Sequence, residues 1–110
     1  NIAKFSDIIL EDKKIRNKQK DFALNIFNGT IQYLEIVDKE ISGHLNKRDI
    51  DEVGFVEKAI LRLSAYEILF SGLDKAIIIN EAIELSKRLA SDNAPRFING
   101  VLDSIKIEKK

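Results

Sequence analysis

The chain has 110 residues, 45% of them hydrophobic, which is enough for one domain with its own core, so we expect residues 1–110 to form a single domain. Its 18 basic and 18 acidic residues give no formal net charge, so binding to nucleic acid would have to rest on a local patch. It has no cysteine and no apolar run long enough to cross a bilayer, which excludes disulfides, thiolate metal sites and membrane spans and indicates a cytoplasmic protein.

The first 42 residues predict two helices. Residues 1–10 carry apolar side chains at helical spacing and predict a short helix, and residues 11–42 predict one long amphipathic helix. Gly29 interrupts the long helix at a cost of roughly 1 kcal/mol relative to Ala, which is tolerable where another helix passes close by. The basic run between Lys13 and Lys20 is either a phosphate-contacting patch or, as is more common, a solvated helix face.

A turn region, SGHLNKRDIDEVG, follows at residues 42–54 and contains the single histidine, His44. His44 has no cysteine or suitably spaced carboxylate with which to hold a metal, and no serine or threonine is placed to use it as a base. We therefore interpret it as a surface turn residue.

Residues 53–70 predict the central helix of the domain, because this segment is apolar on two nearly opposite faces. Such a helix must be covered on both sides. Two narrow polar strips separate the faces, one with Lys58 and Arg62 and the other with Glu57 and Ser64. Glu67 falls within an apolar face, where it is either a carboxylate with a perturbed pKa or, as we favour, a half-buried acceptor for a donor on a neighbouring helix.

Two further helices complete the prediction. Gly72 stops the central helix, Asp74 caps a helix over residues 75–90, and Pro95 suits the first turn of a last helix capped by Asp92 or Asn93. The inner face of the last helix contains Ile98, Val101, Leu102 and Ile105. The sequence thus predicts an all-α, compact bundle of about five helices.

No catalytic motif is present: the sequence lacks a Gly-rich phosphate loop, a nucleophile elbow and an HExxH motif, so we expect neither an enzyme nor a cofactor or metal site. The last helix offers a binding surface instead. Arg96 and Gly100 lie on its outer side and Phe97 about 90° from the inner face, which makes a small platform for an unstacked base. The alternative is that Phe97 simply packs under the preceding turn or against a further helix.

Three segments in this order, VEKAILRLSAYE, INEAIELSKRLA and RFINGVLDSI, resemble the NusB family of bacterial transcription antitermination factors, and the similarity extends from about Phe5 to Ile105. The resemblance implies an all-α fold without catalysis. It also implies binding of single-stranded boxA RNA, a heterodimer with the ribosomal protein NusE, and a place in the RNA polymerase antitermination complex of ribosomal RNA operons.

The RNA-contacting positions that the resemblance implies are Glu57, Asp92, Asn93, Arg96 and Phe97. The platform on the last helix therefore coincides with the RNA side of the family. The arginine-rich first helix of the family has no counterpart here, so we expect weaker RNA binding with a smaller salt dependence, and either exposed apolar surface or a homodimer that covers it.

Two alternatives remain open. The RNA-binding domain of ribosomal RNA cytosine methyltransferases resembles the same fold, but there a large α/β domain follows, whereas this sequence ends at Lys110 in a charged tail. A helical module that docks only proteins would suit the zero net charge, although the Arg96–Phe97 pair argues against it.

Overall fold

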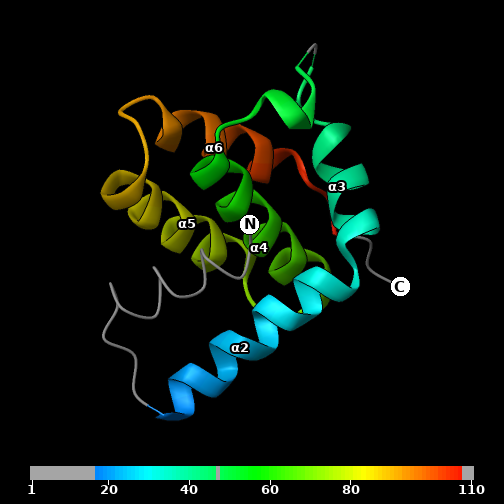
Figure 1. Cartoon of the computed structure of the whole chain (residues 1–110), viewed down its shortest axis with the longest axis vertical. Coiled ribbons are helices and arrows are strands. Elements are labelled where there is room, and N and C mark those ends of the chain that lie inside the picture. Colours follow the sequence, from blue (N-terminus) through cyan, green and yellow to red (C-terminus); the bar gives the residue numbers. More distant parts are fainter. Residues whose placement is uncertain (1–16, 47, 108–110) are drawn as a thin grey trace.

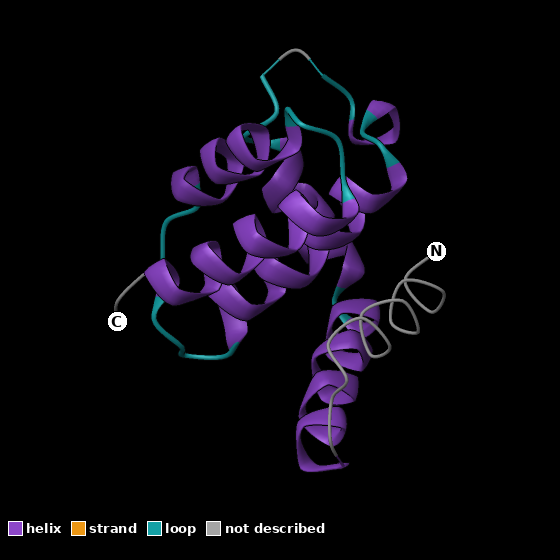
Figure 2. Cartoon of the chain, turned by 90° about the vertical axis from the view of Figure 1, so that its left-hand side faces the viewer, coloured by secondary structure: helices purple, strands orange, loops and turns teal. Residues whose placement is uncertain are grey.

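The computed structural model describes residues 17–46 and 48–107, and the regular secondary structure in this part of the chain is α-helical apart from one 3-10 turn (Figures 1 and 2). Its elements are α2 (Asn17–Gln32), α3 (Leu34–Ser42), η1 (Ile50–Glu52), α4 (Phe55–Phe70), α5 (Lys75–Leu89) and α6 (Ala94–Ser104). The all-α prediction is confirmed. The helix predicted for residues 1–10 and the beginning of the basic run lie outside the described residues.

Helix α4 is the central element, as its sequence predicts. It packs against α2, α3, α5 and α6, which surround it in Figure 1. Residues from both of its apolar faces are buried: Ala59, Ile60, Leu61, Leu63, Ala65 and Ile68. Ser64, which the sequence places on one of the two polar strips, is also buried. The last residue, Phe70, lies at the edge of this cover and is exposed.

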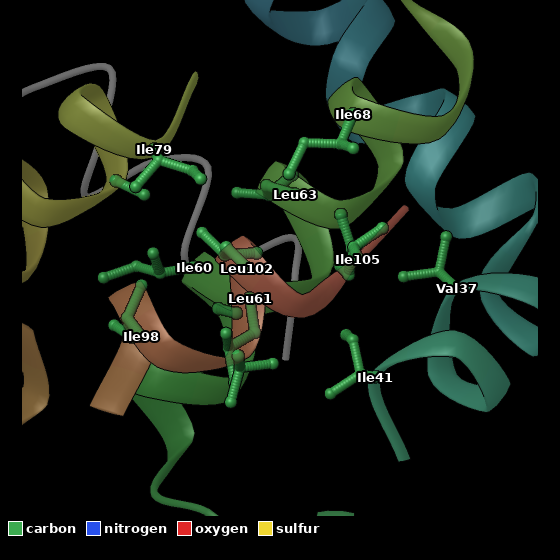
Figure 3. Close-up of a cluster of buried hydrophobic side chains, with 14 of the residues drawn as sticks. Val37, Ile41, Ile60, Leu61, Leu63, Ile68, Ile79, Ile98, Leu102 and Ile105 are labelled. Atoms are coloured by element: carbon green, nitrogen blue, oxygen red, sulfur yellow. The ribbon is translucent and has the colours of Figure 1, made fainter. Parts of the chain in front are cut away.

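The core forms where α4 meets α6 and α3. Figure 3 shows Ile60 and Leu61 of α4 beside Ile98 and Leu102 of α6, with Val37 and Ile41 of α3 approaching from the other side. The four residues predicted for the inner face of the last helix are all buried: Ile98, Val101, Leu102 and Ile105. Burial of such side chains contributes about 1.5–3 kcal/mol each, so the amphipathic pattern of α6 is sufficient to fix its orientation.

The single long helix predicted for residues 11–42 is wrong, because the chain leaves helical geometry at Tyr33 (φ −107°, ψ 27°) and forms two helices. The break is not at Gly29. That residue stays within α2, and a Cβ built on it would lie 2.2 Å from Oη of Tyr66 on α4. The expectation that another helix passes close to Gly29 is therefore confirmed. The change of direction at Tyr33 allows α2 and α3 each to contact α4.

Helices α5 and α6 begin and end close to the predicted positions. Gly72 adopts φ +75°, and the carboxylate of Asp74 accepts a hydrogen bond of 2.9 Å from the backbone N–H of Ala76. Lys75 then links the two helices, since its Nζ donates to the carbonyl oxygens of Asp103 (2.7 Å) and Ile105 at the end of α6. A cation at this position also complements the negative end of the helix dipole.

Two local predictions need correction. Asn93 occupies the position before α6, but its side chain makes no capping hydrogen bond. His44 lies in the turn after α3, as predicted, but it is half-buried, and its Nε2 lies 2.9 Å from Oε2 of Glu40, one turn earlier on α3. Within residues 17–46 and 48–107, no helix is long and apolar enough to cross a membrane.

Candidate nucleic-acid interface

The start of α6 carries four of the five residues expected to contact RNA. Asp92 and Asn93 are exposed in the turn that precedes the helix, and Arg96 is exposed in its first turn. Phe97 is half-buried and packs against the edge of the core. The amphipathic pattern of α6 explains this arrangement: once Ile98 points inward, residue 96 faces solvent and residue 97 lies at the boundary.

Another side chain covers the ring of Phe97. The guanidinium carbon of Arg48 lies over it, 4.6 Å from the ring centroid, which is a cation–π contact. Phe97 therefore packs against an arginine from the loop between α3 and η1, a partner that the sequence did not suggest. Sequence reasoning missed Arg48, because 49 positions separate it from Phe97 and neither carries a pattern that links them.

The loop that holds Arg48 is anchored on both sides. On one side Leu45 is buried, and its carbonyl oxygen accepts a hydrogen bond of 3.1 Å from the N–H of Arg48. On the other side Asp49 and Glu52 form a capping box around η1: Asp49 accepts from the N–H of Asp51, and Glu52 accepts from the N–H of Asp49. These bonds fix the backbone at the point from which the Arg48 side chain reaches α6.

Glu57, the fifth expected residue, lies on α4 and not on α6. It is half-buried in the first turn of α4, and its carboxylate folds back over Gly54, where an added Cβ would lie 2.9 Å from both carboxylate oxygens. A carboxylate in this position complements the positive end of the helix dipole. Among the described residues, no hydrogen bond or ion pair joins the Glu57 side chain to the residues at the start of α6.

Glu67 is half-buried on α4, and its pKa is raised, first by burial and then by the negative charge of Glu81 on α5. Both effects disfavour the charged carboxylate. The sequence suggested a donor on a neighbouring helix, but the described part of the chain supplies none, so Glu67 is instead a carboxylate with a perturbed pKa. It lies on a different helix from Arg96 and Phe97, and no contact connects it with them.

An ion pair that the sequence did not predict holds α3 to α4. Nε and the terminal NH2 of Arg62 each donate to a different carboxylate oxygen of Asp38, and both distances are 2.8 Å. The two side chains are 19% and 26% exposed, so the pair is partly shielded from solvent. Bidentate pairs of this kind have a defined orientation as well as a favourable energy.

The chain is similar to proteins of one family. A model of the NusB family matches residues 1–106. The transcription antitermination protein NusB of Aliarcobacter butzleri is 67% identical over 104 residues, which are 94% of this chain and 79% of that protein. The proteins of the same name from Sulfurovum sp. and Campylobacter jejuni are 64% and 55% identical, cover 96% of this chain in each case, and are covered over 81% and 80% of their own lengths.

Solved structures agree with this similarity. NusB of T. maritima superposes with a TM-score of 0.77 at 34% identity, and the match covers 89% of this chain and 71% of that one. A chain in the crystal structure of a plectonemic RNA supercoil superposes with a TM-score of 0.78 at 29% identity, covering 89% of this chain and 72% of that one.

Proposed function

This chain belongs to the NusB family of transcription antitermination proteins, and we propose that it acts by binding the single-stranded boxA element of nascent ribosomal RNA at the start of α6. The observation that carries the proposal is the exposed Arg96 beside the half-buried Phe97, with a second arginine on the Phe97 ring. An aromatic ring with cations around it suits unstacked bases and the phosphates between them.

Each of the five expected residues has a role suited to its chemistry. Arg96 supplies charge-assisted hydrogen bonds to phosphate, and Phe97 supports stacking. Asn93 presents both a donor and an acceptor to a base edge, whereas Asp92 and Glu57 accept hydrogen bonds from base amino groups. Hydrogen-bond acceptors add selectivity for particular bases but no electrostatic attraction to RNA, which is consistent with a chain of zero net charge.

The proposal includes protein partners. NusE and this chain form a heterodimer. The heterodimer, once it has bound boxA RNA, joins the RNA polymerase antitermination complex on ribosomal RNA operons. A second protein on the same RNA would raise the affinity through the linked contacts.

The test is to measure binding of a fluorescently labelled boxA RNA and a scrambled RNA of equal length, with and without NusE, at two salt concentrations. We expect the boxA RNA to bind more tightly and NusE to strengthen that binding. Arg96→Ala and Phe97→Leu should each weaken it, the second without opening a large cavity because leucine keeps most of the apolar volume. Lys106→Ala is the matched control, since Lys106 is exposed just beyond the far end of α6.

Equal affinity for the two RNAs would contradict boxA recognition. Selective binding that neither Arg96→Ala nor Phe97→Leu weakens would place the RNA on another surface of the protein.

A further inference from the structure

The loop between α3 and η1 places the side chain of Arg48 on the solvent side of the candidate interface. Arg48 is exposed, Phe97 is half-buried, and the guanidinium carbon lies 4.6 Å from the centroid of the ring. A ligand that approaches this end of α6 therefore meets the Arg48 guanidinium before the Phe97 ring.

Among the residues that the structure describes, no ion pair neutralises the charge of Arg48. No carboxylate within residues 17–46 and 48–107 lies close enough to pair with it, in contrast to Arg62, which both oxygens of Asp38 engage. A guanidinium that lies on an aromatic ring keeps its second flat face and its N–H edge available. Bases stack on such planes, and the N–H groups can donate to phosphate oxygens.

Two features hold Arg48 in this position before any ligand binds. The anchored loop fixes its backbone through the bond from its N–H to the carbonyl of Leu45. The Phe97 ring, which packs against the core, holds the guanidinium carbon 4.6 Å from its centroid. A side chain that is ordered in advance loses less conformational entropy when the ligand binds.

We propose that Arg48 is an RNA-contacting residue, in which the outer face of its guanidinium stacks on one unpaired base while its N–H edge contacts a neighbouring phosphate. Phe97 then acts beneath the guanidinium and orients it, and Arg96 supplies a second cation from the same turn of α6. This inference rests on the proposed function, because it requires that single-stranded RNA binds at the start of α6.

The experiment compares Arg48→Ala, Arg48→Lys and the control Lys106→Ala, in the whole 110-residue chain, with the labelled boxA RNA over a range of salt concentrations. Arg48→Ala should weaken binding about 5- to 150-fold, the range that corresponds to one stacked base. It should also reduce the slope of log K against log salt by about 0.7, the value for one phosphate contact on a single strand.

Arg48→Lys separates stacking from charge. Lysine keeps the positive charge but has no flat face, so the salt slope should stay close to that of the wild type while the affinity still falls. Lys106→Ala, which removes one charge at the far end of α6, should bind within about twofold of the wild type, because an exposed charge at that distance is largely screened. The thermal unfolding temperature of each variant shows whether the substitution has destabilised the packing of Phe97.

Several outcomes would overturn the inference. If Phe97→Leu weakens RNA binding and Arg48→Ala does not, the proposed function stands and the role of Arg48 is wrong. If Arg48→Ala binds more tightly, Arg48 is a cover that RNA must displace. If Arg48→Lys binds as well as the wild type, Arg48 contributes charge but no stacking. If the wild type does not distinguish boxA from scrambled RNA, the proposed function fails and the inference fails with it.

Discussion

Replacing Gly29 by alanine should destabilise the protein, although alanine is the better helix former. An alanine Cβ at this position would lie 2.2 Å from Oη and 2.3 Å from Cζ of Tyr66, more than 1 Å closer than ordinary contact. The ring cannot shift freely, because its centroid lies 5.2 Å from that of Phe70 and 6.4 Å from that of Tyr33. Overpacking costs about 1–3 kcal/mol and the helix propensity of alanine recovers about 1 kcal/mol, so we expect a net loss of up to about 2 kcal/mol.

Gly100 is the matched control, since it lies within α6 and has no atom within 4 Å of an added Cβ. Gly100→Ala should therefore stabilise the protein by roughly 0.5–1 kcal/mol. The assay is urea unfolding followed by circular dichroism, and thermal unfolding should show the same signs, with a loss of up to roughly 15 °C for Gly29→Ala. In a Tyr66→Ala background the effect of Gly29→Ala should change sign. If Gly29→Ala stabilises the wild-type protein as much as Gly100→Ala does, the close approach of Tyr66 to α2 is wrong.

Three further substitutions test contacts between helices. Because the pKa of Glu67 is raised in the folded state, folding is more favourable while this carboxyl group is protonated. That contribution is lost as the pH rises from the ordinary pKa of 4.5 through the folded-state pKa. Glu67→Gln should therefore be more stable than the wild type at pH 7 and equally stable in acid. Asp38→Ala should lower the free energy of unfolding by about 1–3 kcal/mol, because it leaves the shielded Arg62 unpaired; a loss below about 0.5 kcal/mol in urea unfolding would show the pair to be unimportant. Lys75→Met should cost about 1 kcal/mol by removing the donor to the end of α6, whereas Lys87→Met, at a 58% exposed position, should change unfolding by less than about 0.5 kcal/mol.

Local patterns in the sequence were sufficient to predict most of the helices and their buried faces. Periodicity places Ile98, Val101 and Leu102 on one face of α6 whatever the helix packs against, and the same pattern puts Arg96 in solvent. The stop at Gly72 and the cap at Asp74 are equally local, because each depends on the backbone within a few residues. For the candidate interface, the exposure of Arg96 and the boundary position of Phe97 were predictable for this reason.

Only the tertiary structure decided the features in which residues far apart in the chain meet. The break at Tyr33 has no signal in the sequence, and the close approach of Tyr66 to Gly29 depends on where α4 lies. The arginine over Phe97 likewise comes from a loop whose path is set by its anchors, and no periodicity of either segment encodes that path. A repeat of 3.6 residues determines which side of a helix is buried, whereas the partner on that side is determined by packing among all the helices at once.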